Sequence, residues 1–294
     1  MKKTTNIAET NSLKCFLGLA PATYEQAKFI IISAPLEKTV SYLGGTKFGP
    51  EEIIKASPFL EFYDEDTETE PQDKGICTLK PLDFENKNIE QSLDLIYDSC
   101  KQIIKDKKIP YILGGEHSIS QAPVKAFKDC IGNDFCVLHF DAHTDLRNSY
   151  ENTKHSHAAV LKRIFELDIK HVSIGIRSVS KEEAVFIKEN NIHICYAKNI
   201  DKQKIDLAFS KLTSKNIYIT FDIDVFDPSL IPATGTPEPG GISWDNALYC
   251  FEKLKQLNKN IIGFDLVELS PMPNLEHPNF TAAKLIYKTM AYLF

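Results

Sequence analysis

Short apolar runs rich in β-branched residues alternate along this chain with longer stretches that repeat apolar residues at helical spacing. Runs that are apolar throughout are typical of strands buried on both faces of a parallel sheet. The alternation therefore predicts an α/β fold in which helices cover both faces of the sheet. The expected strands are 29–35, 109–115, 135–140, 171–177, 191–197, 216–221 and 261–269, and the expected helices include 89–107, 118–129, 181–190, 245–258 and 279–293.

The 294 residues are expected to form a single domain, 1–294. Neither a low-complexity linker nor an internal repeat divides them, and the length is compatible with one large domain. The segment DEDTETEPQDKG (64–75) is interpreted as a polar surface loop whose acidic side chains serve solvation.

The charge balance bears on the class of partner. The formal net charge is -6, which disfavours nucleic acid or an anionic membrane as the main partner and suits a small cationic substrate. No apolar run approaches the roughly 18 residues of a membrane helix, and the first 16 residues lack the apolar stretch of a signal peptide. The seven cysteines form no CxxC pair, so we expect reduced thiols in a cytoplasmic protein rather than a cysteine-based zinc site.

Four of the expected strands end in acidic or imidazole side chains. In open α/β sheets, ligands bind at the carboxyl ends of the strands. We therefore expect a single site built from segments that are distant in sequence. The strand 109–115 runs into Glu116 and His117, 135–140 runs into DAHTD (141–145), 216–221 runs into DIDVFDP (222–228), and 261–269 contains Glu268.

The spacing within these motifs suits metal ligands. In an extended segment, side chains two residues apart point to the same face, and buried carboxylates at such short range repel one another strongly without a cation. Taken singly, each of these residues is better explained as a helix cap, a turn residue or a core histidine. The combination predicts two imidazoles and four carboxylates as ligands: His117, Asp141, His143, Asp145, Asp222 and Asp224.

Six such ligands exceed the four of a structural zinc site and suit two bridged divalent ions about 3.5–4 Å apart. Oxygen-rich ligation with some imidazole favours manganese. Two ions that share a water lower its pKa from about 16 towards neutrality, which makes hydroxide available as a nucleophile. The motifs therefore predict a hydrolase with two Mn²⁺ ions per subunit.

The chain resembles the ureohydrolase family, which contains arginases and agmatinases. The resemblance implies a three-layer α/β/α sandwich around a mostly parallel sheet, two manganese ions held by the six ligands above, and assembly into homotrimers or hexamers. It also implies hydrolysis of a guanidinium group to urea and an amine through a metal-bridging hydroxide. The matching segments are SYLGGTKFGPEEI (41–53), GGEHS (114–118), HFDAHTD (139–145), SHAA (156–159), SIGIRS (173–178), FDIDVFDPSLIPATGTPEPGG (221–241) and LVELSP (266–271).

The resemblance also implies roles for residues around the metals. Glu268 matches the glutamate that holds the substrate guanidinium, through two parallel hydrogen bonds. His157 matches the family's proton-handling histidine and is preferred over His155, and Asp145 is a second candidate proton carrier. Thr236 is expected to line the substrate site. The competing interpretations are a surface histidine, a strand-end ion pair for Glu268 and a simple turn at Thr236.

The remaining polar candidates are assigned more simply. Glu116 and Asp227 are expected to orient metal ligands. The other histidines are taken as ordinary core or surface residues, namely His139, His171, His193 and His277.

The identity of the substrate rests on the segment after the D-x-H-x-D motif. Arginases resemble one another in having Asn two residues beyond it, whereas here that residue is Arg147, in a DLR context similar to bacterial agmatinases. We therefore predict hydrolysis of agmatine to putrescine and urea. The alternatives are guanidinobutyrate, whose carboxylate Arg147 could bind, arginine, a metal-dependent amidohydrolase or deacetylase of the same fold, and a non-catalytic metal-binding relative.

Overall fold

The computed structural model describes residues 14–18 and 22–292. The N-terminal stretch considered above for a signal peptide lies outside these residues up to position 13, as does residue 293 at the end of the last expected helix. Among the described residues, no helix is long and apolar enough to cross a membrane.

The centre of the molecule is a sheet of eight strands in the order β2-β1-β3-β8-β7-β4-β5-β6. Every neighbouring pair is parallel, which confirms the expected parallel sheet. All seven expected strands are present, and the additional β2 is a three-residue edge strand too short to leave a sequence pattern. The strands are β1 (Phe29–Ala34), β2 (Ile76–Thr78), β3 (Ile109–Gly114), β4 (Cys136–Phe140), β5 (His171–Ile176), β6 (His193–Tyr196), β7 (Asn216–Asp222) and β8 (Asn260–Val267).

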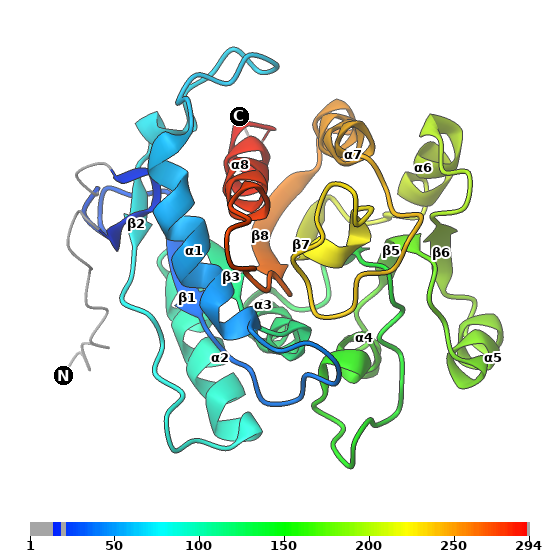
Figure 1. Cartoon of the computed structure of the whole chain (residues 1–294). Coiled ribbons are helices and arrows are strands. Elements are labelled where there is room, and N and C mark those ends of the chain that lie inside the picture. The colour runs from blue at the N-terminus through cyan, green and yellow to red at the C-terminus, as the bar shows by residue number, and fades with distance from the viewer. Residues whose placement is uncertain (1–13, 19–21, 293–294) are drawn as a thin grey trace.

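Helices cover both faces of this sheet, which confirms the three-layer sandwich (Figure 1). One layer contains α1, α6, α7 and α8, and the other contains α2, α3, α4 and α5. The helices are α1 (Gly49–Ala56), α2 (Ile89–Lys105), α3 (Gln121–Ile131), α4 (Val160–Glu166), α5 (Lys181–Glu189), α6 (Lys202–Phe209), α7 (Trp244–Gln256) and α8 (His277–Tyr292).

The strand order places four carboxyl ends side by side. The strands β1 and β3 lie on one side of the central pair β8 and β7, and β4, β5 and β6 lie on the other side. The connection from β3 to β4 must therefore cross both central strands. Crevices at such a reversal of strand order are where open α/β sheets bind ligands. The chemistry predicted after β3, β4, β7 and β8 meets at this edge.

A close approach of the chain fixes the end of β3. The backbone N–H of Gly115 donates to the Ala34 carbonyl at 2.9 Å, and that of Glu116 donates to the Leu36 carbonyl at 2.8 Å. A Cβ atom at Gly115 would clash with the Leu36 backbone. Glycine is required there because only its missing side chain lets the two segments pass, and this contact sets the position of His117.

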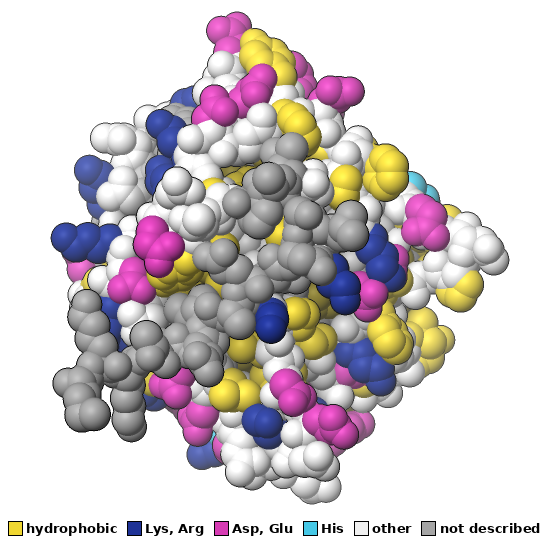
Figure 2. All heavy atoms as spheres, turned by 90° about the vertical axis from the view of Figure 1, so that its left-hand side faces the viewer, with side chains coloured by type: hydrophobic (Ala, Val, Ile, Leu, Met, Phe, Trp, Pro, Cys, Tyr) yellow, Lys and Arg dark blue, Asp and Glu magenta, His cyan; other side chains and the backbone are white. Residues whose placement is uncertain are grey.

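The acidic segment 64–75 is only partly the solvated loop that was expected. The Asp64 side chain is fully buried, and its Oδ2 lies 2.9 Å from Nζ of Lys288 on α8, whose side chain is 2% exposed. Glu65 and Asp66 also pair with Lys288 but are 66% and 40% exposed. Figure 2 shows acidic side chains gathered at the top of the molecule, and intermixed acidic and basic side chains elsewhere on the described part of that face.

Candidate metal centre and substrate pocket

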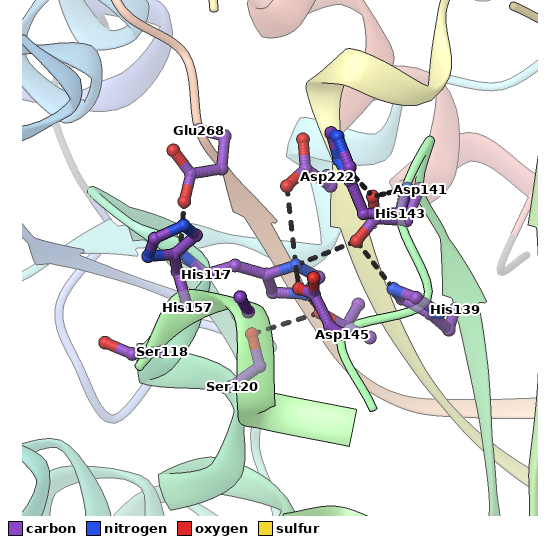
Figure 3. Close-up of polar contacts among 12 residues, drawn as sticks. His117, Ser118, Ser120, His139, Asp141, His143, Asp145, His157, Asp222 and Glu268 are labelled. Atoms are coloured by element: carbon purple, nitrogen blue, oxygen red, sulfur yellow. Dashed lines mark hydrogen bonds and ion pairs between the residues drawn. The ribbon is translucent and has the colours of Figure 1, made fainter. Parts of the chain in front are cut away.

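The predicted site residues meet at the carboxyl edge of the sheet, around a pocket of about 240 Å³. They come from the segments that follow β3, β4 and β7 and from the end of β8 (Figure 3). The sixth candidate ligand, Asp141, lies fully buried beneath them. The pocket is lined by His117, His143, Asp145, Asp222, Asp224, Glu268 and the predicted rim residues Thr236 and His157.

One group of candidate ligands surrounds Nδ1 of His117, which begins the 3₁₀ turn η6 (His117–Ser120). This nitrogen lies 3.1 Å from Asp141 Oδ2, 3.1 Å from Asp145 Oδ2 and 3.4 Å from Asp222 Oδ2. It is buried and has no hydrogen-bond partner. In the metal-free protein these carboxylates outweigh burial and raise the pKa of His117 well above its usual value. When the ring is neutral, its Nδ1 lone pair and the three carboxylate oxygens form a donor set that suits a shared divalent cation.

A second group surrounds His143. Its Nδ1 lies 3.0 Å from Asp224 Oδ2 and 3.4 Å from Asp141 Oδ1. Asp141 therefore presents one oxygen to each imidazole, as a carboxylate that bridges two ions would. The donor set, with imidazole nitrogens and carboxylate oxygens in two adjoining groups, fits a pair of divalent cations.

The carboxylates of the cluster perturb one another because they are buried together. Burial and the neighbouring charges of Asp224 and Asp141 raise the pKa of Asp222 well above its usual value. Burial and the charge of Asp141 raise the pKa of Asp145 to about 7. Burial alone would raise the pKa of Asp141, but its contacts with histidines outweigh it and hold the pKa well below the usual value. Within the described chain, no Lys or Arg side chain forms an ion pair with any of the four carboxylates.

His139 belongs to this site, although the sequence analysis gave it no role. It is fully buried, its Nε2 lies 2.8 Å from Asp141 Oδ2, and its Nδ1 lies 2.9 Å from Ser173 Oγ. Since the carboxylate can only accept, Nε2–H donates to it and the Ser173 hydroxyl donates to Nδ1. His139 thus orients Asp141. The period-two row that groups Asp141, His143 and Asp145 includes His139 when it is extended back by one step.

Two of the candidate residues adopt a left-handed backbone conformation. Asp145 has φ of 52° and Glu268 has φ of 64°. This region is uncommon for residues other than Gly, Asn and Asp, and such strain concentrates at functional sites. The Glu268 backbone is held by its N–H, which donates to the Gly115 carbonyl at 2.8 Å. The turn directs the Glu268 side chain into the pocket.

Glu268 lies next to the candidate ligands and accepts a hydrogen bond from the backbone of one of them, His117. Its Oε1 accepts the backbone N–H of His117 at 2.6 Å, and the residue is 8% exposed. Burial, reinforced by the nearby charge of Glu116, raises the pKa of Glu268 well above its usual value. No Lys or Arg partner for it exists among the described residues, so the geometry disfavours the strand-end ion pair considered above.

His157 lies at the wall of the pocket and His155 does not. Nδ1 of His157 is 3.2 Å from Thr39 Oγ1, and the Tyr150 ring meets the imidazole edge-on at 5.9 Å. Burial lowers the pKa of His157, so the neutral imidazole predominates near pH 7. His155 instead places Nδ1 2.8 Å from Gln121 Oε1, which anchors the loop outside the pocket lining.

Glu116 and Asp227 were expected to orient metal ligands, but in the structure their carboxylates accept backbone N–H groups of neighbouring loops. Glu116 accepts the backbone N–H groups of Lys38 and Thr39, both at 2.6 Å, and fixes the loop that contacts His157. Asp227 accepts the N–H of Gly240 at 2.8 Å and closes the loop after β7. The roles differ because a turn next to each carboxylate supplies N–H donors at closer range.

Arg177 was not singled out from the sequence, although it lies in the SIGIRS segment. Its guanidinium donates to main-chain carbonyls alone, including those of Asp224 at 2.7 Å, Val225 at 3.1 Å and Glu238 at 2.7 Å. It thereby fixes the backbone of the loop that carries Asp224. Carbonyl partners leave no trace in side-chain patterns, so the sequence offered no signal for this contact.

Arg147 stands at the mouth of the pocket. Its guanidinium carbon lies 5.1 Å from the centre of the Tyr150 ring, in cation–π contact. Within the described residues it forms no ion pair with a carboxylate. Arg147 and Tyr150 together form the outer wall on the side of His157.

Comparison with known proteins places these features in one family. The sequence model of the Arginase family matches residues 27–292. The chain is 37% identical over 291 residues to the N(1)-aminopropylagmatine ureohydrolase of Synechocystis sp., covering 96% of this chain and 95% of that protein. It is 36% identical over 281 residues to the agmatinase of Bacillus subtilis, covering 95% and 96%. The crystal structure of agmatine ureohydrolase of Thermoplasma volcanium superposes with a TM-score of 0.84, 32% identity and 92% coverage of each chain.

Proposed function

This chain belongs to the arginase family, and from that premise we propose that it hydrolyses agmatine to putrescine and urea. The cofactor would be two Mn²⁺ ions. His117, Asp145 and Asp222 would hold one ion, His143 and Asp224 the other, and Asp141 would bridge them. This role is supported by the two oxygens of Asp141, of which Oδ2 lies 3.1 Å from His117 Nδ1 and Oδ1 lies 3.4 Å from His143 Nδ1.

The observation that carries the proposal is the double role of His117. Its side chain faces the carboxylate cluster, while its backbone N–H holds Glu268 Oε1 at 2.6 Å. A guanidinium bound by Glu268 is therefore placed directly beside the ligand cluster. A buried carboxylate with a raised pKa becomes ionised more readily when a planar cation pairs with it through two N–H donors.

The residues divide the chemistry between them. When bound, the two metal ions would supply an activated water as the nucleophile and would stabilise the negative charge that develops during the reaction. Glu268 orients the guanidinium carbon. Asp145 turns Oδ2 towards His117 Nδ1 at 3.1 Å, and its other carboxylate oxygen is suited to accept and return a proton in this pocket. His157 at the wall can relay a proton to the leaving amine, since a neutral imidazole accepts at one nitrogen and releases from the other.

Agmatine is favoured because its distal end is an amine. The DLR context at Arg147 and the names of the Bacillus subtilis and Thermoplasma volcanium proteins support it. The second candidate is N(1)-aminopropylagmatine, which the Synechocystis relative is named for. Guanidinobutyrate is a third, because the Arg147 guanidinium has no carboxylate partner within the described residues.

The test is a substrate panel measured by urea release with Mn²⁺ added and with Mn²⁺ chelated. It compares agmatine, N(1)-aminopropylagmatine, guanidinobutyrate and arginine at equal concentration. We expect the highest kcat/KM for agmatine and no turnover after chelation. Preference for either amine substrate retains the ureohydrolase proposal and decides between them, whereas a preference for guanidinobutyrate assigns Arg147 to its carboxylate. Amide hydrolysis without urea release would instead indicate a deacetylase.

The cellular setting and the assembly are part of the proposal. Cys100, Cys136 and Cys250 are buried free thiols, which suits a reducing, cytoplasmic compartment. We expect a homotrimer or homohexamer on the strength of the family resemblance. The mass of the protein in solution, measured by light scattering, tests this expectation.

A further inference from the structure

A second layer of polar side chains lies directly beneath His117, inside the sheet. It consists of Asp265 on β8, Thr220 and Tyr218 on β7, and Ser120 at the end of η6, and all four residues are buried. Thr220 Oγ1 lies 2.9 Å from His117 Nε2 and 2.7 Å from Asp265 Oδ1. His117 and Ser120 lie on the same 3₁₀ turn, η6, and both are labelled in Figure 3.

Asp265 gathers the hydroxyl groups of its three neighbours. Ser120 Oγ donates to Asp265 Oδ1 at 3.0 Å, Thr220 Oγ1 donates to the same oxygen at 2.7 Å, and the Tyr218 hydroxyl donates to Oδ2 at 2.5 Å. A lone carboxylate in a central strand is costly unless it is fully hydrogen-bonded. Burial still raises its pKa above the usual value. None of these groups is among the candidate metal ligands.

Counting the hydrogens determines the direction of each bond. An ionised carboxylate only accepts, and a threonine hydroxyl has a single hydrogen to donate. If the Thr220 hydroxyl gave that hydrogen to His117, or to Ser120 Oγ at 3.0 Å, its oxygen and Asp265 Oδ1 would face each other at the shorter distance of 2.7 Å with lone pairs only. The hydrogen therefore goes to Asp265, and the Thr220 oxygen must accept the N–H of His117 Nε2.

We propose that Asp265 is a positioning residue for the metal centre, acting through Thr220 to keep the hydrogen of the neutral His117 ring on Nε2. The opposite nitrogen, Nδ1, is then left with its lone pair towards Asp141, Asp145 and Asp222. In the other tautomer, a hydrogen on Nδ1 would occupy the position from which the nitrogen binds a cation. The oxygen or nitrogen that accepts from a metal-binding histidine sets its tautomer and orientation.

This inference rests on the metal centre proposed above and is tested by Mn²⁺ affinity rather than by turnover. Metal-free protein is titrated with Mn²⁺, and the free ion is followed by electron paramagnetic resonance. We expect Asp265→Asn and Thr220→Val each to weaken binding by about 10–100-fold. If Asp265 acts through Thr220, the double variant binds no more weakly than Thr220→Val alone.

The double variant separates this relay from a simple charge effect. A negative charge at residue 265 would also attract the ions directly, and that contribution would remain after Thr220 is replaced. An additive loss in the double variant therefore overturns the proposal, as does an Asp265→Asn variant that binds Mn²⁺ as tightly as the parent. If the parent protein itself binds no Mn²⁺, the metal centre fails and the relay fails with it.

Matched variants guard against a general loss of folding. Thr220→Ser keeps the hydroxyl and should keep the affinity of the parent. Thr289→Val makes the same change at another buried threonine, whose hydroxyl donates to the Ile286 carbonyl at 2.7 Å on α8, and should leave Mn²⁺ affinity unchanged. If Asp265→Asn does not fold, the contrast between Thr220→Val and Thr220→Ser carries the test, and equal affinities overturn the relay.

A spectroscopic measurement reads the tautomer itself. In Zn²⁺-loaded protein labelled with ¹⁵N-histidine, the two ring nitrogens of a neutral imidazole have distinct chemical shifts. The resonance that responds to Thr220→Val identifies His117. We expect a protonated Nε2 in the parent and in Thr220→Ser, and a hydrogen on Nδ1 in the parent overturns the assignment.

Discussion

Two clusters of buried charge in this fold are built in opposite ways. In one, Nζ of Lys288 lies 2.9 Å from Asp64, 3.1 Å from Glu65 and 2.6 Å from Asp66, and fastens the acidic loop to α8. In the other, four aspartates converge at the strand ends with only imidazoles between them. The first cluster contains a lysine as a permanent counter-charge, whereas the second contains only the imidazoles of His117 and His143, whose pKa values the aspartates raise.

The effect on the pKa values follows that difference. Burial by itself would raise the pKa of Asp64, but its bonds with Lys288 and Thr67 outweigh burial and lower it. In the pocket, burial and neighbouring carboxylates instead raise the pKa of Asp222 and Asp145. The Lys288 cluster therefore contributes to stability, and the pocket cluster stores a repulsion that a bound cation relieves. A carboxylate cluster that binds divalent ions is therefore expected to lower the stability of the metal-free protein.

The largest expected effect comes from removing one charge from each cluster. Asp222→Asn should weaken Mn²⁺ binding by more than about 100-fold and abolish urea release, because it removes a ligand itself. Removing a residue that only contacts a ligand typically weakens metal binding by about 10–100-fold. It should also stabilise the metal-free protein, because a repulsive carboxylate is gone. Urea denaturation and Mn²⁺ titration measure both quantities.

The matched change in the other cluster is Asp64→Asn, which should destabilise the protein and leave Mn²⁺ affinity intact. Both substitutions replace Asp by Asn. Changes of opposite sign in the free energy of unfolding would therefore show that the two clusters differ in their electrostatics. Destabilisation of the metal-free protein by Asp222→Asn would contradict it.

The next effect separates metal binding from proton transfer within the pocket. His157→Ala should lower kcat by about 10²–10⁴ if the imidazole relays the proton to the leaving amine. Its nitrogens contact Thr39 and no candidate ligand, so Mn²⁺ affinity should not change. Steady-state kinetics and Mn²⁺ titration measure the two. His155→Ala is the control, since that side chain contacts Gln121 instead. Full activity of His157→Ala would remove His157 from the mechanism.

The Lys288 cluster is tested from its other side by Lys288→Met. The substitution leaves Asp64 buried without its counter-charge, and we expect a loss of about 3 kcal/mol, the lower end for a broken buried pair, because Glu65 and Asp66 remain accessible to water. Chemical denaturation of the metal-free protein measures it. The double variant Lys288→Met with Asp64→Asn should recover part of the loss, since no uncompensated charge remains. Equal stability of the parent and Lys288→Met would mean that the cluster is only a surface contact.

The sequence predicted the pocket cluster much better than the Lys288 cluster, for a physical reason. The strand period places Asp141, His143 and Asp145 on one face, and parallel strands bring their carboxyl ends to one edge. The strand period is a local rule, and the shared edge of the strand ends is a property of every parallel sheet. Both can therefore be applied to a single sequence. The pairing of Asp64 with Lys288 spans 224 positions and follows no period, so the same acidic segment was interpreted as solvated.

The same limit explains what was missed inside the site. Asp265 is a single carboxylate in an apolar strand, which signals a buried polar partner without naming it. The carbonyl contacts of Arg177 depend on the path of two loops, and no side-chain pattern records a loop path. His139 is different, because the period-two row already contained it.

The smallest effect concerns pH, and it follows from the raised pKa of Asp145. A carboxyl whose folded pKa of about 7 exceeds its unfolded value of about 4 favours the folded state most at low pH, and this contribution is lost as pH rises through that interval. The lowered pKa values of His139, His157 and His171 act in the opposite direction between pH 5 and about 6.5, so the Asp145 contribution is measured against an Asp145→Asn variant. Between pH 5 and pH 8, the Tm of the metal-free parent should fall relative to that of the variant, by at least the roughly 2–4 °C that about 1 kcal/mol produces in a large domain. The lowered pKa of Asp64 has the opposite sign, but its contribution is lost only as pH falls from about 4 through the folded pKa, below this range. In the parent, Mn²⁺ at saturation should remove the Asp145 contribution, because the bound ions keep the carboxylates ionised. Thermal unfolding of the parent and of Asp145→Asn at the two pH values, with Mn²⁺ and with chelator, measures this. An equal change of Tm with pH in the two metal-free proteins would mean that the neighbouring carboxylates do not repel Asp145.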